Sequence, residues 1–293
     1  MQDIDQASLP AVIATKFAKF VAVDWTGARG ERHRSIAVAV CETGSAGPVV
    51  LTPDRPWTRA EVFALIAGFA ARSERVLVGM DFSFSLPFAD AGNYFPGDAS
   101  PPDARTLWAE VAWIAAADPH HAAHAYVDHR RRHFWCGAAD GPRRPLARLR
   151  TVEHLDAAAG GVPSSCFVLR GAAQCGKASL SGMRLLDTLD GVAVWPFDPL
   201  PARGPVLVEI YCRIFAKAGG VRGKIRDRAT LDAALARLGS GPADVPATFA
   251  DHIGDAVISA AGLRRIADDE RWWHPPGLTP AIARTEGWTF GVA

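Results

Sequence analysis

The chain has 293 residues, of which 49% are hydrophobic and 22% are charged, and its 32 Lys and Arg against 31 Asp and Glu leave a formal net charge of +1. This composition excludes an intrinsically disordered chain. No run of 18 apolar residues exists, so a transmembrane helix is not expected. The near-zero net charge excludes a surface that is positively charged all over and binds polyanions in general. The acidic and polar residues 1–10 do not resemble a signal peptide, and the five scattered cysteines contain no CxxC pair. We therefore expect a cytoplasmic protein that does not bind membranes and keeps its thiols reduced.

Apolar patterns along the chain predict alternating strands and helices. The strands are expected at residues 20–24, 35–41, 75–82 and 206–212, and the helices at 58–72, 103–117, 183–189, 227–238 and 251–266. A capping box at Thr58 and Glu61 marks the start of the first helix. This alternation favours an α/β fold, a mixed sheet flanked by helices, in one domain over residues 1–293 with an irregular or helical insertion at about 88–200.

Four acidic residues lie in otherwise apolar segments, where burial of a carboxylate costs folding free energy. Asp24, Asp81 and Glu209 lie at or near the carboxyl ends of otherwise apolar strands, and Asp255 lies among small and apolar residues of a helix. A buried acid costs several kcal/mol unless it is paired or binds a metal, and ligands of open α/β sheets bind at the carboxyl ends of strands. The four acids together predict a site for Mg²⁺ or Mn²⁺, which prefer carboxylate and water ligands. Each acid alone could instead cap a helix or pair with a buried Arg, and Asp251 is an alternative to Asp255.

Several short motifs in their order and spacing resemble the DUF429 family, for which a ribonuclease-H-like fold is predicted. They are FVAVDWTGA, VLVGMDFSFSLP, RHFWCG, FVLRGAAQCGKASLSGMRLLDTL, VEIYCR, DHIGDAVISAAG and EGWTFGV. The resemblance implies a metal-dependent phosphodiesterase or nuclease in which Asp24, Asp81, Glu209 and Asp255 are the catalytic acids and the metal ligands for two-metal hydrolysis. One departure lies beside Glu209, where Tyr211-Cys212-Arg213 replaces the Tyr-Pro-Arg expected of the family.

Basic and aromatic residues are candidates for binding a nucleic acid or another phosphodiester. Residues 128–150 contain seven Arg and two Asp, a local net charge of +5, with Arg131 and Trp135 as candidate phosphate and base contacts. Lys177, Arg213 and Lys224 are further candidates for substrate phosphates. The alternative is an ordinary solvated surface, with Trp135 in the core.

Two other segments have both a functional and a structural interpretation. Residues 171–182 are Gly-rich like a phosphate loop, but Ala178 stands where that motif needs Ser or Thr, so we expect a Gly-rich loop at most. His120 and His124, and likewise His129 and His133, have the i, i+4 spacing of one helix face, which favours a polar surface helix over a zinc site.

Two alternative functions remain open at this point. Residues 24–27 resemble the first phosphate loop of an ATP-handling phosphotransferase of the actin/hexokinase type, although no second copy of such a domain is found. The chain could also be a non-catalytic nucleic-acid-binding module with the same fold.

Overall fold

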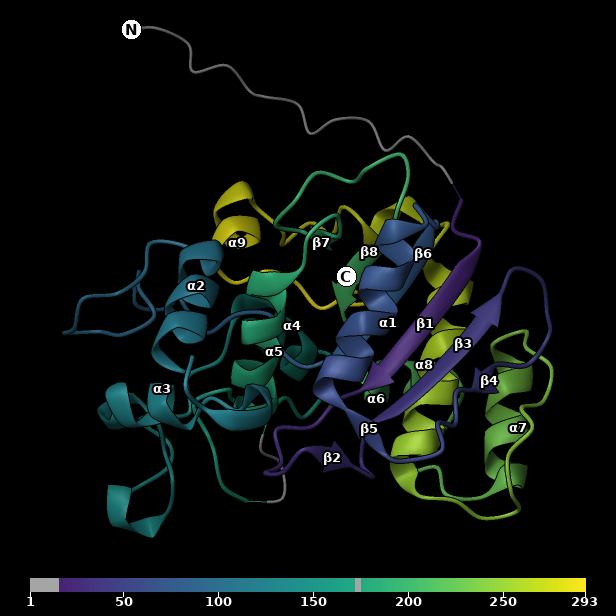
Figure 1. The fold of residues 1–293 in the computed structure, drawn as a ribbon, viewed down its shortest axis with the longest axis horizontal. Coiled ribbons are helices and arrows are strands. Elements are labelled where there is room, and N and C mark those ends of the chain that lie inside the picture. Colours follow the sequence, from purple (N-terminus) through teal and green to yellow (C-terminus); the bar gives the residue numbers. More distant parts are fainter. Residues whose placement is uncertain (1–15, 172–174) are drawn as a thin grey trace, which may run out of the picture.

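The computed structural model describes residues 16–171 and 175–293, so the expectation for residues 1–10 and part of that for residues 171–182 lie outside it. Its centre is a six-stranded mixed sheet in the order β4-β3-β1-β6-β8-β7 (Figure 1). β3 is antiparallel to β1 and β4, whereas β6, β8 and β7 run parallel to β1. The bounds are β1 Lys19–Asp24, β3 Ala37–Glu42, β4 Val49–Val50, β6 Val76–Asp81, β7 Ala193–Trp195 and β8 Val206–Glu209, and a separate small sheet pairs β2 Arg32–His33 with β5 Trp57–Thr58.

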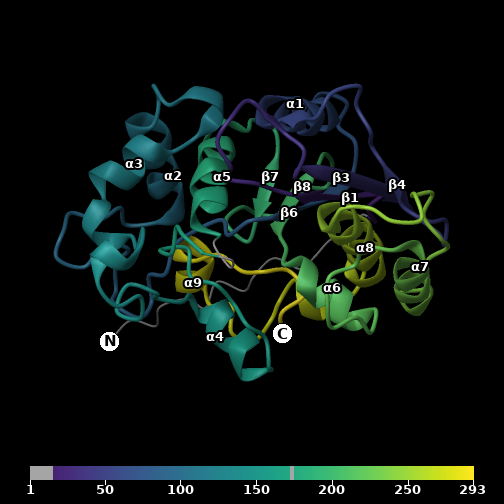
Figure 2. The same cartoon turned by 90° about the horizontal axis from the view of Figure 1, so that it is seen from below.

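Helices cover both faces of the sheet, as the alternation predicted (Figure 2). One face carries α1 and α5, and the other carries α6, α7 and α8, of which α8 packs along β1 and β3. The helices are α1 Arg59–Ala71, α2 Ala104–Ile114, α3 His124–His129, α4 Thr151–Ala158, α5 Gly176–Thr188, α6 Cys212–Ala218, α7 Arg228–Arg237, α8 Asp251–Ile266 and α9 Pro280–Thr285. Within the described ranges, every helix is too short or too polar to cross a bilayer.

Side chains of the strands alternate between two cores, as the period of two in a strand requires. In β1, Val21 and Val23 join the core under α1 and α5, whereas Phe20 and Ala22 join the core under α8. This alternation decides which face each acid at a strand end occupies.

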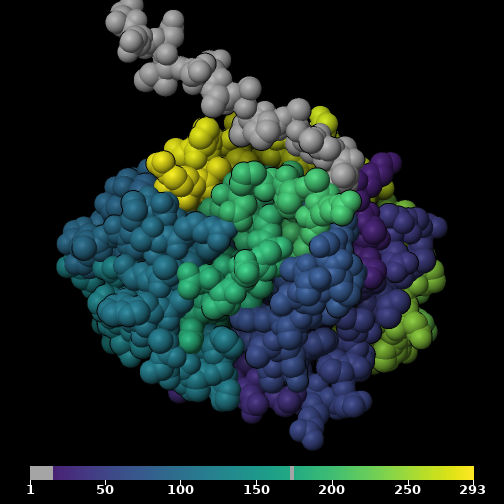
Figure 3. Space-filling view, turned by 45° about the horizontal axis from the view of Figure 1, so that its top comes forward, coloured from purple at the N-terminus to yellow at the C-terminus, as the bar shows by residue number. Residues whose placement is uncertain are grey.

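The insertion at about 88–200 forms one side of the molecule and shares the core under α1 and α5 (Figure 3). Trp108 of α2 is fully buried, and its indole Nε1 donates a 2.7 Å hydrogen bond to the carbonyl oxygen of Phe84. Tyr126 and Phe167 of the insertion lie in the same cluster as Val78 of β6. The insertion also supplies β7, the edge strand of the main sheet, which the sequence did not reveal.

The structure corrects two predicted boundaries and the predicted arrangement of the histidines. The strand expected at 206–212 ends at Glu209, and Cys212 begins α6. The helix expected at 183–189 begins at Gly176, so residues 176–182 are helical rather than a Gly-rich loop. The four His do not share a helix, because a 3-10 turn at Pro119–His121, α3 and a second turn at Arg131–His133 divide them.

Candidate functional site

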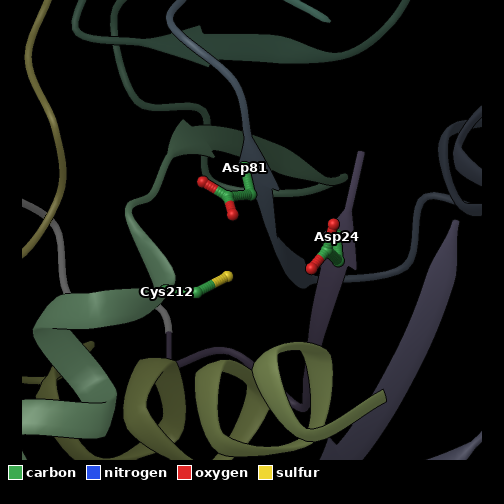
Figure 4. Close-up of side chains that lie close together, drawn as sticks. All are labelled: Asp24, Asp81 and Cys212. Carbon is green, nitrogen blue, oxygen red and sulfur yellow. The ribbon is translucent and has the colours of Figure 1, made fainter. Parts of the chain in front are cut away.

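Asp24 and Asp81 form an acidic pair at the carboxyl ends of neighbouring parallel strands. They are partners in the register of β1 and β6, so their side chains leave the sheet on the same face. A ligand atom of each lies within 4.8 Å of the other and of the Cys212 sulfur, at the start of α6 (Figure 4). Both aspartates follow the alternation onto the α8 side of the sheet, where Cys212 is buried.

Burial and mutual repulsion raise the pKa values of this acidic pair. The pKa of Asp24 lies well above its ordinary value of 3.8, first because of burial and then because of the charges of Asp81 and Asp255. Burial raises the pKa of Asp81 to about 7, although a hydrogen bond with Cys212 opposes the shift. A positive charge between the two carboxylates would offset their repulsion and favour the charged form of both, which lowers both pKa values.

Asp255 approaches the acidic pair from α8 and is already paired with a lysine. It is only 8% exposed, and Lys224 Nζ lies 3.3 Å from its Oδ2 and 3.1 Å from Oδ2 of Asp251. Burial raises the pKa of Asp255, and Lys224 opposes that shift. Lys224, a candidate for binding phosphate, is thus paired with both acids of α8 in this structure, and Arg226 also pairs with Asp251.

Glu209 lies apart from the acidic pair because of the register in which β8 pairs with β6. It pairs with Met80 rather than with Asp81, so the alternation along β8 turns its side chain to the other face of the sheet. Its carboxylate is 97% buried and accepts hydrogen bonds from both terminal nitrogens of Arg150. The Phe84 amide at 2.7 Å and the Thr289 hydroxyl at 2.6 Å complete its partners. Glu209 therefore forms an ion pair with Arg150 and does not join Asp24 and Asp81.

A cavity of about 470 Å³ opens beside these acids. Asp81, Glu209 and Asp255 all contribute to its wall, so the acids of the two faces meet at the rim of the sheet. Arg213 also lines this acidic cavity, and its guanidinium donates to the carbonyl of Gly223 at 3.3 Å.

Most of the arginines in the basic segment 128–150 are paired with carboxylates, four of which come from outside the segment and one of which, Asp140, lies within it. Five of its seven Arg form ion pairs with carboxylates. Arg131 pairs with Asp140, and the indole of Trp135 donates to the carbonyl of Gly141 at 3.1 Å. Lys177 lies on the first turn of α5 and lines a different cavity, described below.

Two residues of the site, Cys212 and Arg150, were not predicted from the sequence. Cys212 reaches the acidic pair only because the chain leaves the sheet at Glu209, and Arg150 meets Glu209 across 59 residues of sequence. Comparison of the chain with protein-family models, with curated proteins and with solved structures finds no match. Membership of the DUF429 family stays a prediction from the motifs.

Proposed function

We propose that this protein is a metal-dependent phosphodiesterase or nuclease with a ribonuclease-H-like fold. The observation that carries the proposal is the acidic pair, in which the register brings two partly buried carboxylates together at the carboxyl ends of adjacent parallel strands. Such a pair is destabilising without a cation, because burial and repulsion both disfavour its charged form.

The order of strands supports this choice of fold. A ribonuclease-H-like sheet has an antiparallel meander of three strands, followed by further strands that run parallel to the first. The order β4-β3-β1-β6-β8, with β3 antiparallel to both its neighbours, has this form. In this interpretation the elements between β6 and β8 are the insertion.

The donor set of the acidic pair suits Mg²⁺ or Mn²⁺. Asp24 and Asp81 supply the hard oxygen ligands that these ions prefer, and Asp255 would join them once Lys224 moves to a substrate phosphate. Cys212 is the exception, because burial raises the pKa of its thiol well above the ordinary value and keeps it protonated. A divalent cation bound here supplies Lewis acidity toward a phosphoryl oxygen and a lowered pKa of water. Glu209 would hold the Arg150 side chain and the Phe84 backbone in place at the edge of the acidic cavity through the hydrogen bonds that it accepts from them.

The test is metal binding and hydrolysis by the wild-type chain and by Asp24→Asn. We expect millimolar Mn²⁺ or Mg²⁺ to raise the Tm of the wild type, by the equivalent of about 2.7 kcal/mol at one hundred times Kd. Asp24→Asn should melt no lower than the metal-free wild type, because it removes a buried charge, yet it should gain no stability from metal. An activated diester and single- and double-stranded RNA and DNA serve as substrates.

The exposed Asp54→Asn is the matched control and should behave like the wild type. Absence of calorimetric metal binding together with absence of cleavage would end the proposal. Metal-independent binding of nucleic acid without cleavage would favour the non-catalytic module. The ATP-handling alternative needs a duplicated domain, and the described residues contain one six-stranded sheet and one small sheet of two strands.

A further inference from the structure

A second cavity, of about 660 Å³, lies beside the loop that follows β1 and the first turns of α5. Its charged lining is Arg29, Arg170 and Lys177 with a single acid, Asp128, and two imidazoles, His120 and His124, add further donors. We call it the basic cavity. Its remaining wall is largely apolar, with contributions from Val127, Leu169 and Leu180.

The three cations of the basic cavity form no ion pair within the part of the chain that the structure describes. Among the described residues no carboxylate lies within ion-pair distance of Arg29, Arg170 or Lys177, and all three are exposed. The Arg29 side chain instead donates from its Nε to Nε2 of His124, at 3.3 Å. The neighbouring segment 128–150 contrasts with this, because five of its seven Arg are paired.

Two buried guanidinium groups lie behind this cavity and add to its positive field. Arg59 is 1% exposed and donates to the carbonyl oxygens of Thr26, Ala28 and His120. Arg184 is 9% exposed and donates to the carbonyl oxygens of Asp118 and Ala122. Neither has a carboxylate partner among the described residues, so their charge is solvated by backbone dipoles but not cancelled.

The same guanidinium groups fix the backbone of the cavity rim. His120 and His121 have φ angles of 54° and 57°, a left-handed conformation that non-glycine residues rarely adopt and that costs of order 1–3 kcal/mol each. The hydrogen bond from Arg59 to the His120 carbonyl, at 2.7 Å, holds one of them. The rim is therefore shaped before any ligand arrives, which lowers the entropic cost of binding.

We propose that the basic cavity binds a phosphorylated nucleotide unit. The unpaired cations would hold the phosphate, and the apolar wall would hold the base and sugar, in a volume within the usual range for small-molecule sites. The binding does not require the acidic pair to be catalytic.

The basic cavity and the acidic cavity share a wall. Trp25 and Ala178 line the acidic cavity, and Gly27, Lys177 and Ser181 line the basic one. The Trp25 indole donates to the Ser181 hydroxyl at 3.1 Å, and a methyl group added at Gly27 would lie 2.3 Å from the Ala178 nitrogen. One substrate with two phosphates could therefore engage both cavities, as an oligonucleotide would.

The experiment is calorimetric titration of the full chain, without metal, with adenosine monophosphate, inorganic phosphate and adenosine. We expect adenosine monophosphate to bind most tightly, phosphate more weakly and adenosine not at all. Arg29→Gln and Lys177→Gln should each weaken binding of the nucleotide about tenfold. The matched control is Arg203→Gln, an exposed residue just before β8 at the opposite end of the strands from Asp24, which should change nothing.

Absence of nucleotide binding at millimolar concentration, or unchanged affinity in the folded Arg29→Gln/Lys177→Gln variant, would overturn the proposal. Asp24→Asn should bind the nucleotide like the wild type. If the wild type binds the nucleotide but neither binds metal nor hydrolyses a diester, only the proposed function is refuted. If the wild type binds metal and hydrolyses a diester but does not bind the nucleotide, only the proposal for the basic cavity is refuted.

Discussion

Asp24 and Asp81 share a face of the sheet, whereas Glu209 faces the other way, and one step of register makes the difference. All three acids interrupt apolar runs, so the sequence reveals that each needs a partner. It does not reveal which partner, because a shift of one residue in the pairing of β8 would turn Glu209 to the other face. Pairing between strands far apart in sequence is a tertiary property, and so are the contacts of Cys212 and Arg150.

The raised pKa of Asp81 predicts how the metal-free protein responds to pH. The folded-state pKa of about 7 exceeds the ordinary 3.8, so the folded state holds this proton more tightly than the unfolded chain. This carboxyl therefore destabilises the fold progressively as pH rises from about 4 to about 7. We expect the free energy of unfolding of the wild type to fall relative to that of Asp81→Asn over this window, as measured by urea unfolding with a chelator present.

A constant difference between the two proteins from pH 4.5 to 7.5 would contradict this account. Adding Mn²⁺ should flatten the wild-type profile above pH 6 and leave that of Asp81→Asn unchanged, because a bound cation favours the ionised carboxyl.

Arg150 is predicted to be the most sensitive arginine of the basic segment. It is 1% exposed and binds both Glu209 and Glu153, so Arg150→Met leaves buried carboxylates without their counter-charge. Breaking a buried pair in this way costs about 3–5 kcal/mol. Arg131→Met, which breaks an exposed pair, should have a much smaller effect in the same denaturant titration. Adding Glu209→Gln to Arg150→Met should restore part of the loss, and no restoration would argue against the pairing.

At the scale of elements, strands β1, β3, β6 and β8 and helices α1, α2, α7 and α8 could be predicted because their apolar patterns and caps are local, whereas the short strands β4 and β7 and helix α6 were not predicted. The capping box at Thr58 and Glu61 is present at the start of α1 as expected. The start of α5 is seven residues earlier than the sequence predicts, because glycine and serine in its first turns indicate a loop, yet Gly182 allows close packing. A methyl group added at Gly182 would lie 2.2 Å from the ring of Phe82, so contact with the sheet overrides helix propensity.

Gly182→Ala therefore tests the packing of α5. Although Ala is the better helix former by about 1 kcal/mol, the clash with Phe82 should give a net loss of about 1–3 kcal/mol. Gly68→Ala in α1 is the matched control, because its nearest neighbour is the flexible Arg72 side chain at 3.1 Å. We expect Gly68→Ala to be neutral or stabilising in thermal unfolding. Equal effects of the two substitutions would contradict this explanation.

At the scale of the whole molecule, the insertion and the sheet are expected to unfold together. Trp108 of the insertion lies in one core cluster with Val78 of β6. Trp108→Ala should cost about 3–5 kcal/mol and lower a single transition seen alike by circular dichroism and by hydrogen exchange of β1 amides. Phe69→Ala, in α1 on the sheet, should shift the same transition. Early loss of the insertion with β1 still protected would show two independent units.

The ion pair of Arg150 and Glu209 also limits how this protein can be shortened or recombined. The cation belongs to the insertion, whereas the carboxylate belongs to a central strand. Trimming the insertion to a tight connection would remove the counter-charge and leave Glu209 buried alone. A shortened protein must therefore retain Arg150 on the new connection or carry a neutral residue at position 209. A chimaera in which the insertion is exchanged must take residues 150 and 209 from the same parent protein.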